Sequence, residues 1–184
     1  MNNEDTKSAK LEEQTNEISA EEIERALATL RRDENFGSGA LAGSIAAILG
    51  AAAWTVVTVV TDYQLGLMSI VVGVFVAFAV RRFGKGLSSQ FQILSAALAL
   101  SGCVLGNFFT LCYFGAQDAG IPFTEFIMTI NPAAVPGVII ETFIPSDALF
   151  YGIAIYEAYK LPLRIVTDEE LTQALDPFSA PTHL

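Results

Sequence analysis

Charged residues are missing from three long stretches of this 184-residue sequence. None lies within residues 36–61, 63–80 or 86–117. A helix needs about 20 apolar residues to cross roughly 30 Å of hydrocarbon, so each stretch is long enough to cross or nearly so. A soluble helix would carry a polar stripe at the 3.6-residue period, and these stretches have none. The sequence therefore predicts an all-α integral membrane protein.

Histidine and cysteine are also scarce, which limits the available chemistry. His183 is the only histidine, so a histidine triad or a histidine-rich metal site is out of reach within one chain. Cys103 and Cys112 lie nine residues apart, about 13 Å along a helix, too far for a disulfide within that helix. No nucleophile–base pair and no phosphate-binding loop is found. We expect no catalytic residues, no cofactor, no metal and no enzymatic activity.

Basic residues are half as numerous as acidic ones, and the formal net charge is −10. This balance argues against nucleic acid as a partner. Half of the acidic residues lie in the first 34 positions, so the excess belongs mainly to one tail. We predict an acidic tail at residues 1–35, a membrane domain in contact with lipid at 36–164, and a C-terminal tail at 165–184.

Four transmembrane helices are predicted, at residues 38–60, 65–81, 91–114 and 146–162. With four crossings all ten basic residues fall on one face, which the positive-inside rule makes cytoplasmic. The prediction is thus a multi-pass protein of a bacterial inner (plasma) membrane with both termini in the cytoplasm. The topology-setting residues nearest the predicted helices are Arg31, Arg32, Arg81, Arg82, Lys85, Lys160 and Arg164.

Each tail contains the pattern of a helix start. Ser19-Ala20-Glu21-Glu22 and Thr167-Asp168-Glu169-Glu170 both match the capping box. Apolar residues at helical spacing follow each of them. We therefore expect a short amphipathic helix at residues 19–33 and another in the C-terminal tail.

The segment at residues 115–145 is long for a connection between membrane helices, yet it is largely apolar. Its two apolar pieces, residues 122–128 and 138–144, are each too short to span a bilayer. An interfacial helix pair on the outer face is the favoured interpretation. A re-entrant segment that lines a cavity is the alternative.

A faint internal repeat links the two halves of the membrane domain. Residues 48–50 resemble 104–106, and residues 73–81 resemble 152–160. Both predicted hairpins run in, out and in again, so a duplication would relate them in parallel.

Glycines provide the clearest packing signal. Small residues spaced by four let helix backbones approach closely in lipid. Packing between the first and third helices is the favoured use of these faces, and homo-oligomerisation is the alternative. The candidate packing residues are Gly39, Gly43, Gly50, Gly102 and Gly106.

Two polar residues are candidates for function inside the membrane. Glu157 is the acid that the sequence places inside a predicted span, although Lys160 lies one turn away and can pair with it. Asn107 can hydrogen-bond to a neighbouring helix. Four aromatic residues are predicted to lie at the outer interface, as such residues commonly do. They are Trp54, Tyr63, Tyr113 and Tyr151.

The stretch around Trp54, Gly66, Gly73 and the turn Gly84-Lys85-Gly86 resembles a recurring segment of uncharacterised bacterial multi-helix inner-membrane proteins. In those proteins a helix with a tryptophan is followed by a glycine-spaced helix and a basic turn. The resemblance covers about residues 36–114. Some of those proteins carry an N-terminal zinc ribbon, and this chain has no N-terminal cysteine. The resemblance implies a membrane location and no particular activity.

The lack of catalytic groups, together with two capped tail helices, favours a non-enzymatic accessory subunit or scaffold of a membrane complex. Its partner would be another membrane protein or a second copy of the chain. The alternative is an oligomeric channel or small transporter whose pathway uses residues 115–145, Asn107 and Glu157.

Overall fold

The computed structural model describes residues 20–63, 66–143 and 145–175. All regular secondary structure in these residues is helical, as the sequence predicts. The chain divides into two compact units. The larger is Glu34–Arg164, and the smaller combines the two ends of the chain, up to Asp33 and from Ile165 onward.

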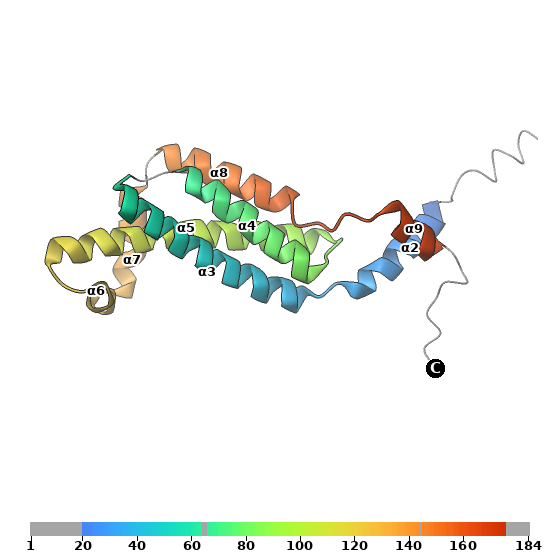
Figure 1. The fold of residues 1–184 in the computed structure, drawn as a ribbon, viewed down its shortest axis with the longest axis horizontal. Coiled ribbons are helices and arrows are strands. Elements are labelled where there is room, and N and C mark those ends of the chain that lie inside the picture. Colours follow the sequence, from blue (N-terminus) through green and yellow to red (C-terminus); the bar gives the residue numbers. More distant parts are fainter. Residues whose placement is uncertain (1–19, 64–65, 144, 176–184) are drawn as a thin grey trace, which may run out of the picture. The chain divides into compact units, whose positions relative to one another are not determined.

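The larger unit contains four packed helices: α3 (Phe36–Thr61), α4 (Leu67–Gly84), α5 (Ser89–Ala119) and α8 (Pro145–Lys160). α4 and α5 pack against each other, and each also packs against α3 and α8. α3 and α8 lie on opposite sides of α4 (Figure 1), and their described backbones do not touch. Two equivalent hairpins would require α3 to touch α8 as α4 touches α5. The packing therefore lacks the symmetry expected from the faint repeat.

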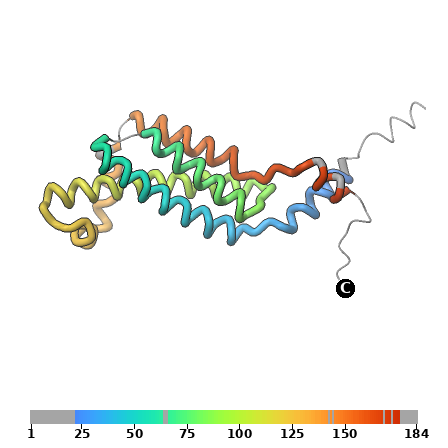
Figure 2. Tube along the Cα trace, viewed as in Figure 1, coloured from blue at the N-terminus to red at the C-terminus, as the bar shows by residue number. Residues whose placement is uncertain are grey.

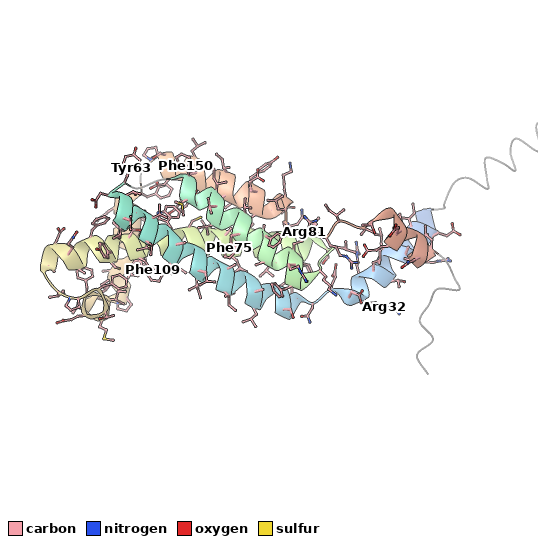
Figure 3. The ribbon with its side chains drawn as sticks, viewed as in Figure 1. Arg32, Tyr63, Phe75, Arg81, Phe109 and Phe150 are labelled. Carbon is pink, nitrogen blue, oxygen red and sulfur yellow. The ribbon has the colours of Figure 1, made fainter. Side chains whose placement is uncertain are left out.

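α8 runs along α4 in the same direction (Figure 2). Near its start Phe150 packs against Gly66, and beyond its end the Arg164 amide donates to the Gly86 carbonyl oxygen at 2.8 Å. We call the end of the larger unit that contains Gly86 the basic end, and the end that contains Gly66 the far end. Figure 3 shows Arg81 toward the basic end and Tyr63 and Phe150 at the far end.

Three helices are long and apolar enough to cross a membrane: α3 with 26 residues, α4 with 18 and α5 with 31. A fourth candidate is a pair of short helices, Phe123–Thr129 and Pro132–Glu141, bent by 83°. α8 has 16 residues, about 24 Å of helix, which is shorter than the hydrocarbon core. The predicted crossing at 146–162 therefore does not follow from helix length. Its support is the position of α8 beside α4.

The inside of the larger unit contains many small residues beside a few large ones such as Trp54 and Phe91, and large apolar residues cover its outside. Gly43, Ala47 and Ala51 of α3 are buried. A surface of large apolar side chains is unfavourable in water and suits lipid. The fold is thus compatible with a multi-pass membrane protein. The exposed apolar residues of α3 and α4 include Leu41, Ile45, Leu49, Val56, Val60, Val71, Phe75 and Phe78.

The connection from α5 to α8 contains α6 (Phe123–Thr129), the 3-10 turn η2 (Pro132–Ala134) and α7 (Val135–Thr142). α6 folds back on the end of α5, where Phe126 packs over Gly115. α7 also contacts α5. Neither helix is long enough to span alone, so the interfacial and the re-entrant interpretations of this segment both stay predictions.

The smaller unit pairs α2 (Ala20–Leu30) with α9 (Asp168–Leu175). Ala26 of α2 is almost fully buried. The predicted capping box at Thr167 is confirmed: its hydroxyl accepts from the Glu170 amide, and the Glu170 carboxylate accepts from the Thr167 amide, both at 3.3 Å. Ser19, the predicted start of the other box, lies outside the described residues.

Candidate functional site

Six buried side chains with polar atoms gather among all four helices of the larger unit, in its far half. We call them the polar cluster. Each is at most 7% exposed. The cluster consists of Trp54 on α3, Ser69 on α4, Cys103 and Asn107 on α5, and Asp147 and Tyr151 on α8.

Tyr151 lies at the centre of the polar cluster. Its hydroxyl donates to the Cys103 carbonyl oxygen at 3.3 Å and also hydrogen-bonds with the Asn107 side chain. The Asp147 carboxyl group is close enough to act on that hydroxyl electrostatically. The Tyr151 ring meets the Trp54 ring at 90°, with 6.3 Å between centroids. One side chain thus connects α8 to both α3 and α5.

Further hydrogen bonds tie α4 and α3 to α5. The Cys103 thiol donates to the Ser69 carbonyl oxygen at 3.7 Å. The Thr55 hydroxyl donates to the Gly106 carbonyl oxygen at 3.4 Å, and the same oxygen also accepts from the Thr110 hydroxyl, within α5, at 2.8 Å. Hydrogen bonds between helices stabilise a helical bundle.

Two buried polar atoms at this level have no hydrogen-bond partner. They are Trp54 Nε1 and Thr58 Oγ1, and both side chains are 1% exposed. Thr58 follows Trp54 by one turn on the same buried face of α3. Buried polar groups are nearly always hydrogen-bonded, so these two atoms are an exception within the larger unit.

Gly106 and the start of α8 make room for the polar cluster. The Trp54 ring lies over Gly106, where an added Cβ would be 3.2 Å from it. Asp147 lies in the first turn of α8, where an acid suits the positive end of the helix dipole. Phe143, just before α8, packs on the Tyr151 ring with 5.8 Å between centroids.

The two predicted polar residues lie in different places. Asn107 belongs to the polar cluster and is 3% exposed. Glu157 is half-buried on α8, about 15 Å along the helix from Asp147. Lys160, its predicted partner, places Nζ 4.9 Å from the Tyr156 ring centroid. The structure therefore does not bring Asn107 and Glu157 together.

The burial of three single residues was not expected from the sequence. Trp54 and Tyr151, predicted to lie at the interface, are buried between helices. Asp147 is a buried acid, with 5% of its surface exposed, whereas Glu157 is half-buried. The sequence analysis missed it because Asp147 follows Pro145-Ser146 and fits the first turn of a helix. The sequence signal that could have identified Asp147 is helical spacing. The buried residues of α8 are 147, 151, 154 and 158, which are separated by four, three and four positions.

The predicted packing glycines all lie at contacts between helices within the chain. An added Cβ at Gly39 would be 3.1 Å from Gly84 Cα, and one at Gly102 would be 3.3 Å from Ala47 Cα. The others face side chains: Gly43 faces Val80 and Leu98, Gly50 faces Val72, and Gly106 faces Trp54. These faces are occupied inside one chain, so they are not free to bind a second copy.

At the basic end, Glu34 holds the connection between α4 and α5. One carboxylate oxygen accepts from the Leu87 and Ser88 amides at 2.7 and 2.9 Å, and the other accepts from the Ser88 hydroxyl at 3.1 Å. The Asn35 amide donates to the Gly84 carbonyl oxygen at 2.9 Å. This connection is thus fixed to the chain that enters α3, and by Arg164 to the chain that leaves α8.

The topology-setting residues are divided between the two units. Arg31 and Arg32 form the 3-10 turn η1 (Arg31–Asp33) of the smaller unit. The other five lie at the basic end of the larger unit: Arg81, Arg82, Lys85, Lys160 and Arg164.

The chemistry available to the polar cluster is hydrogen bonding and proton exchange. It offers a carboxyl group, a phenol, an amide, an indole N–H, a hydroxyl group and a thiol. Over the described residues, no three His, Cys, Asp or Glu side chains are grouped so as to hold a metal ion. Comparisons with protein families, with curated proteins and with solved structures find no match to this chain.

Proposed function

We propose that this chain is a multi-pass protein of the plasma (inner) membrane that crosses the bilayer four times, with both termini in the cytoplasm. The proposal assigns the crossings to α3, α4, α5 and α8. One support is that α8 lies beside α4 along its length, with contacts at Gly66 near one end and at Gly86 near the other. The other is that five basic residues lie at the same end of the larger unit. The basic end would face the cytoplasm, where positive residues are retained. The pair α6 and α7 would then lie on the outer side.

The proposed function is that of a non-enzymatic accessory subunit or scaffold. The observation that carries it is the pairing of α2 with α9, which joins the two ends of the chain in a unit separate from the larger one. Helices of 11 and 8 residues are too short to be stable in water without packing. A partner that covers them would add that packing.

The surface of this unit suggests what it would bind. Ile23 is 37% exposed and Ile165 is 68% exposed. Acidic residues outnumber basic ones on its described surface, with Glu22, Glu24, Asp33, Glu169 and Glu170 against Arg25, Arg31 and Arg32. The expected partner is a membrane protein whose cytoplasmic surface is basic and has an apolar spot at its centre.

Purification in a mild detergent, followed by mass spectrometry of the intact complex, tests the scaffold role. We expect a second protein to accompany the wild-type chain and to be lost from Ile23→Asp. Ala28→Asp introduces the same charge at another exposed position of α2 and should leave the complex intact. Recovery of the wild-type chain alone, as a monomer, would contradict the proposal.

Transport is the second candidate, and the polar cluster favours it because polar side chains at membrane depth commonly mark ion or substrate pathways. The pathway would use Asn107 and Asp147. Purified protein in liposomes should then conduct protons or a small solute, and Asp147→Asn should reduce the flux while Glu157→Gln leaves it unchanged. Wild-type liposomes that show no flux of protons, common ions or small solutes would exclude this role.

A further inference from the structure

We propose that an apolar groove between α3 and α4 binds one acyl chain of an anionic phospholipid, whose phosphate lies at Arg82. We call this groove the lipid groove. The inference rests on the proposed location of the chain in a bilayer, with the basic end at the cytoplasmic surface. It is independent of the scaffold role and of transport.

The lipid groove has small residues at its floor and large apolar side chains at its walls. Its volume is about 470 Å³, within the usual range of ligand pockets. Of its small lining residues, Ala42 and Ala79 are half-buried and Ala46 is buried, so they form the floor. The large lining residues are between 45% and 66% exposed and form the walls. These wall residues are Leu41, Ile45, Leu49, Phe75, Phe78 and Phe83.

The lipid groove begins at the basic end and stops near the middle of the helices. Ser38, in the first turn of α3, and Phe83, in the last turn of α4, line its start. Its other limit is Leu49 on α3 and Phe75 on α4, and Phe75 lies midway along α4 (Figure 3). Leu49 follows Ser38 by eleven residues, which is about 16 Å of helix. Half of a hydrocarbon core of roughly 30 Å is about 15 Å, so the groove has the depth of one lipid leaflet.

A cation lies at the start of the lipid groove. The Arg82 guanidinium carbon is 5.9 Å from the centroid of the Phe83 ring, which is one of the groove walls. Arg82 is exposed, and Arg81 and Lys85 add positive charge to the same end. A guanidinium binds phosphate oxygens through two parallel hydrogen bonds, and basic sites between membrane helices bind anionic headgroups. The groove and Arg82 thus match the two parts of an anionic phospholipid.

A lipid fits this groove better than a protein does. Two copies of the chain that met through this face, with their basic ends on the same side of the bilayer, would bring the two Arg82 side chains toward each other. Like charges that face each other across an interface are unfavourable, whereas a lipid phosphate neutralises the same charge. A spanning helix of another protein would find a groove along only half of its length.

Brominated lipids test the proposal, because bromine on an acyl chain quenches the fluorescence of a tryptophan that it touches. The full chain would carry one tryptophan, as Phe78→Trp in the groove or as Ile93→Trp on α5. Both replaced side chains are exposed, at 65% and 64%. Trp54→Phe, which keeps an aromatic ring, would be the background for both. Each protein would be placed in phosphatidylcholine vesicles with a low fraction of phosphatidylglycerol, with bromine on the acyl chains of one lipid or of the other.

The expected result is an enrichment of the anionic lipid at the groove. Brominated phosphatidylglycerol should quench Phe78→Trp about fivefold more strongly than Ile93→Trp, which is the factor that one basic residue contributes near anionic lipid. Brominated phosphatidylcholine should quench both tryptophans. Arg82→Gln should remove the enrichment. Lys160→Gln, which removes a cation at the same end but on α8, on the other side of α4 from α3 (Figure 1), should preserve it.

A second pair of variants tests the acyl chain rather than the headgroup. Ala42→Leu fills part of the groove floor and should reduce the enrichment at Phe78→Trp, whereas Ala97→Leu, at an exposed position of α5, should not. Equal quenching of both tryptophans by brominated phosphatidylglycerol would overturn the proposal. Protection of Phe78→Trp from both brominated lipids would also overturn it, because a second copy or another protein would then cover the groove. If neither lipid quenched either tryptophan, the proposed location in a bilayer would fail together with the groove.

Discussion

Gly73 of α4 lies directly against the backbone of Ala154 in α8, so closely that an added Cβ would be 2.6 Å from the Ala154 carbonyl oxygen. The obstacle is backbone, which cannot move aside as a flexible side chain could. Ala154 itself is fully buried. This contact brings the backbones of α4 and α8 together, and it makes α8 part of the bundle although α8 is the shortest of the four helices.

Gly73→Ala should therefore destabilise the protein by about 1–3 kcal/mol, the usual range for overpacking a filled core. Gly152→Ala is the matched control, because nothing lies within 4 Å of a Cβ at that exposed position of α8. That control should raise stability by up to about 1 kcal/mol through helix propensity. Unfolding of both variants in detergent by a denaturant measures the difference. Equal stabilities would mean that α8 does not pack on α4 in this way.

Replacement of Glu34 should loosen the connection between α4 and α5. Glu34→Ala leaves the Leu87 and Ser88 amides without their acceptor, at a cost of about 1–3 kcal/mol. Glu34→Gln keeps one acceptor oxygen and should cost less. Hydrogen exchange followed by mass spectrometry should show faster exchange at these two amides in Glu34→Ala, while Asp33→Ala, which alters an exposed neighbour, exchanges like the wild type. Unchanged exchange in Glu34→Ala would contradict the contact.

The burial of Trp54 predicts its fluorescence. It is the only tryptophan and is 1% exposed, so its emission should be that of an indole in apolar surroundings and resist quenching by iodide. A tryptophan at Tyr63, which is 67% exposed, placed in a Trp54→Phe background, should be quenched readily. If iodide quenches both proteins equally, Trp54 lies at the interface, as the sequence alone suggested.

The helices could be predicted because the information that sets them is local. The length of a run without charged residues can be read directly from the sequence. α3 (Phe36–Thr61) extends the helix predicted at 38–60 by only a few residues. Its start is fixed by Asn35, whose side chain accepts from the Ser38 amide at 2.8 Å. α5 extends beyond the span predicted at 91–114, since the helix continues past the apolar run until Gly120 adopts a positive φ of 67°.

The candidate site could not be predicted in the same way, because burial depends on which helices become neighbours. Trp54 and Tyr151 both lie near helix ends, and that position alone is equally compatible with an interfacial or a buried ring. Asp147 is buried because Tyr151, one turn further along α8, is inserted between α3 and α5. A single sequence contains no information about that insertion. The sequence did identify Asn107, because an amide inside an apolar helix is rare enough to be noticed before the neighbouring helices are known.

Cysteine labelling in intact cells tests the four-crossing topology. In a Cys103→Ser, Cys112→Ser background, a cysteine at Gln117 should react with an impermeant maleimide from outside, since this exposed position lies near the end of α5. Cysteines at Ser89, at the basic end, and at Glu169, in α9, should react only after lysis. The physical reason is the cost of about 2.5–3.5 kcal/mol for placing one cation at mid-membrane, which keeps Arg81, Arg82 and Lys85 on the cytoplasmic side. Glu169 is the decisive position, because α8 is too short to guarantee a crossing by length. Labelling of Glu169→Cys in intact cells would mean an odd number of spans: either α8 does not cross, or the bent pair α6 and α7 crosses in addition to it.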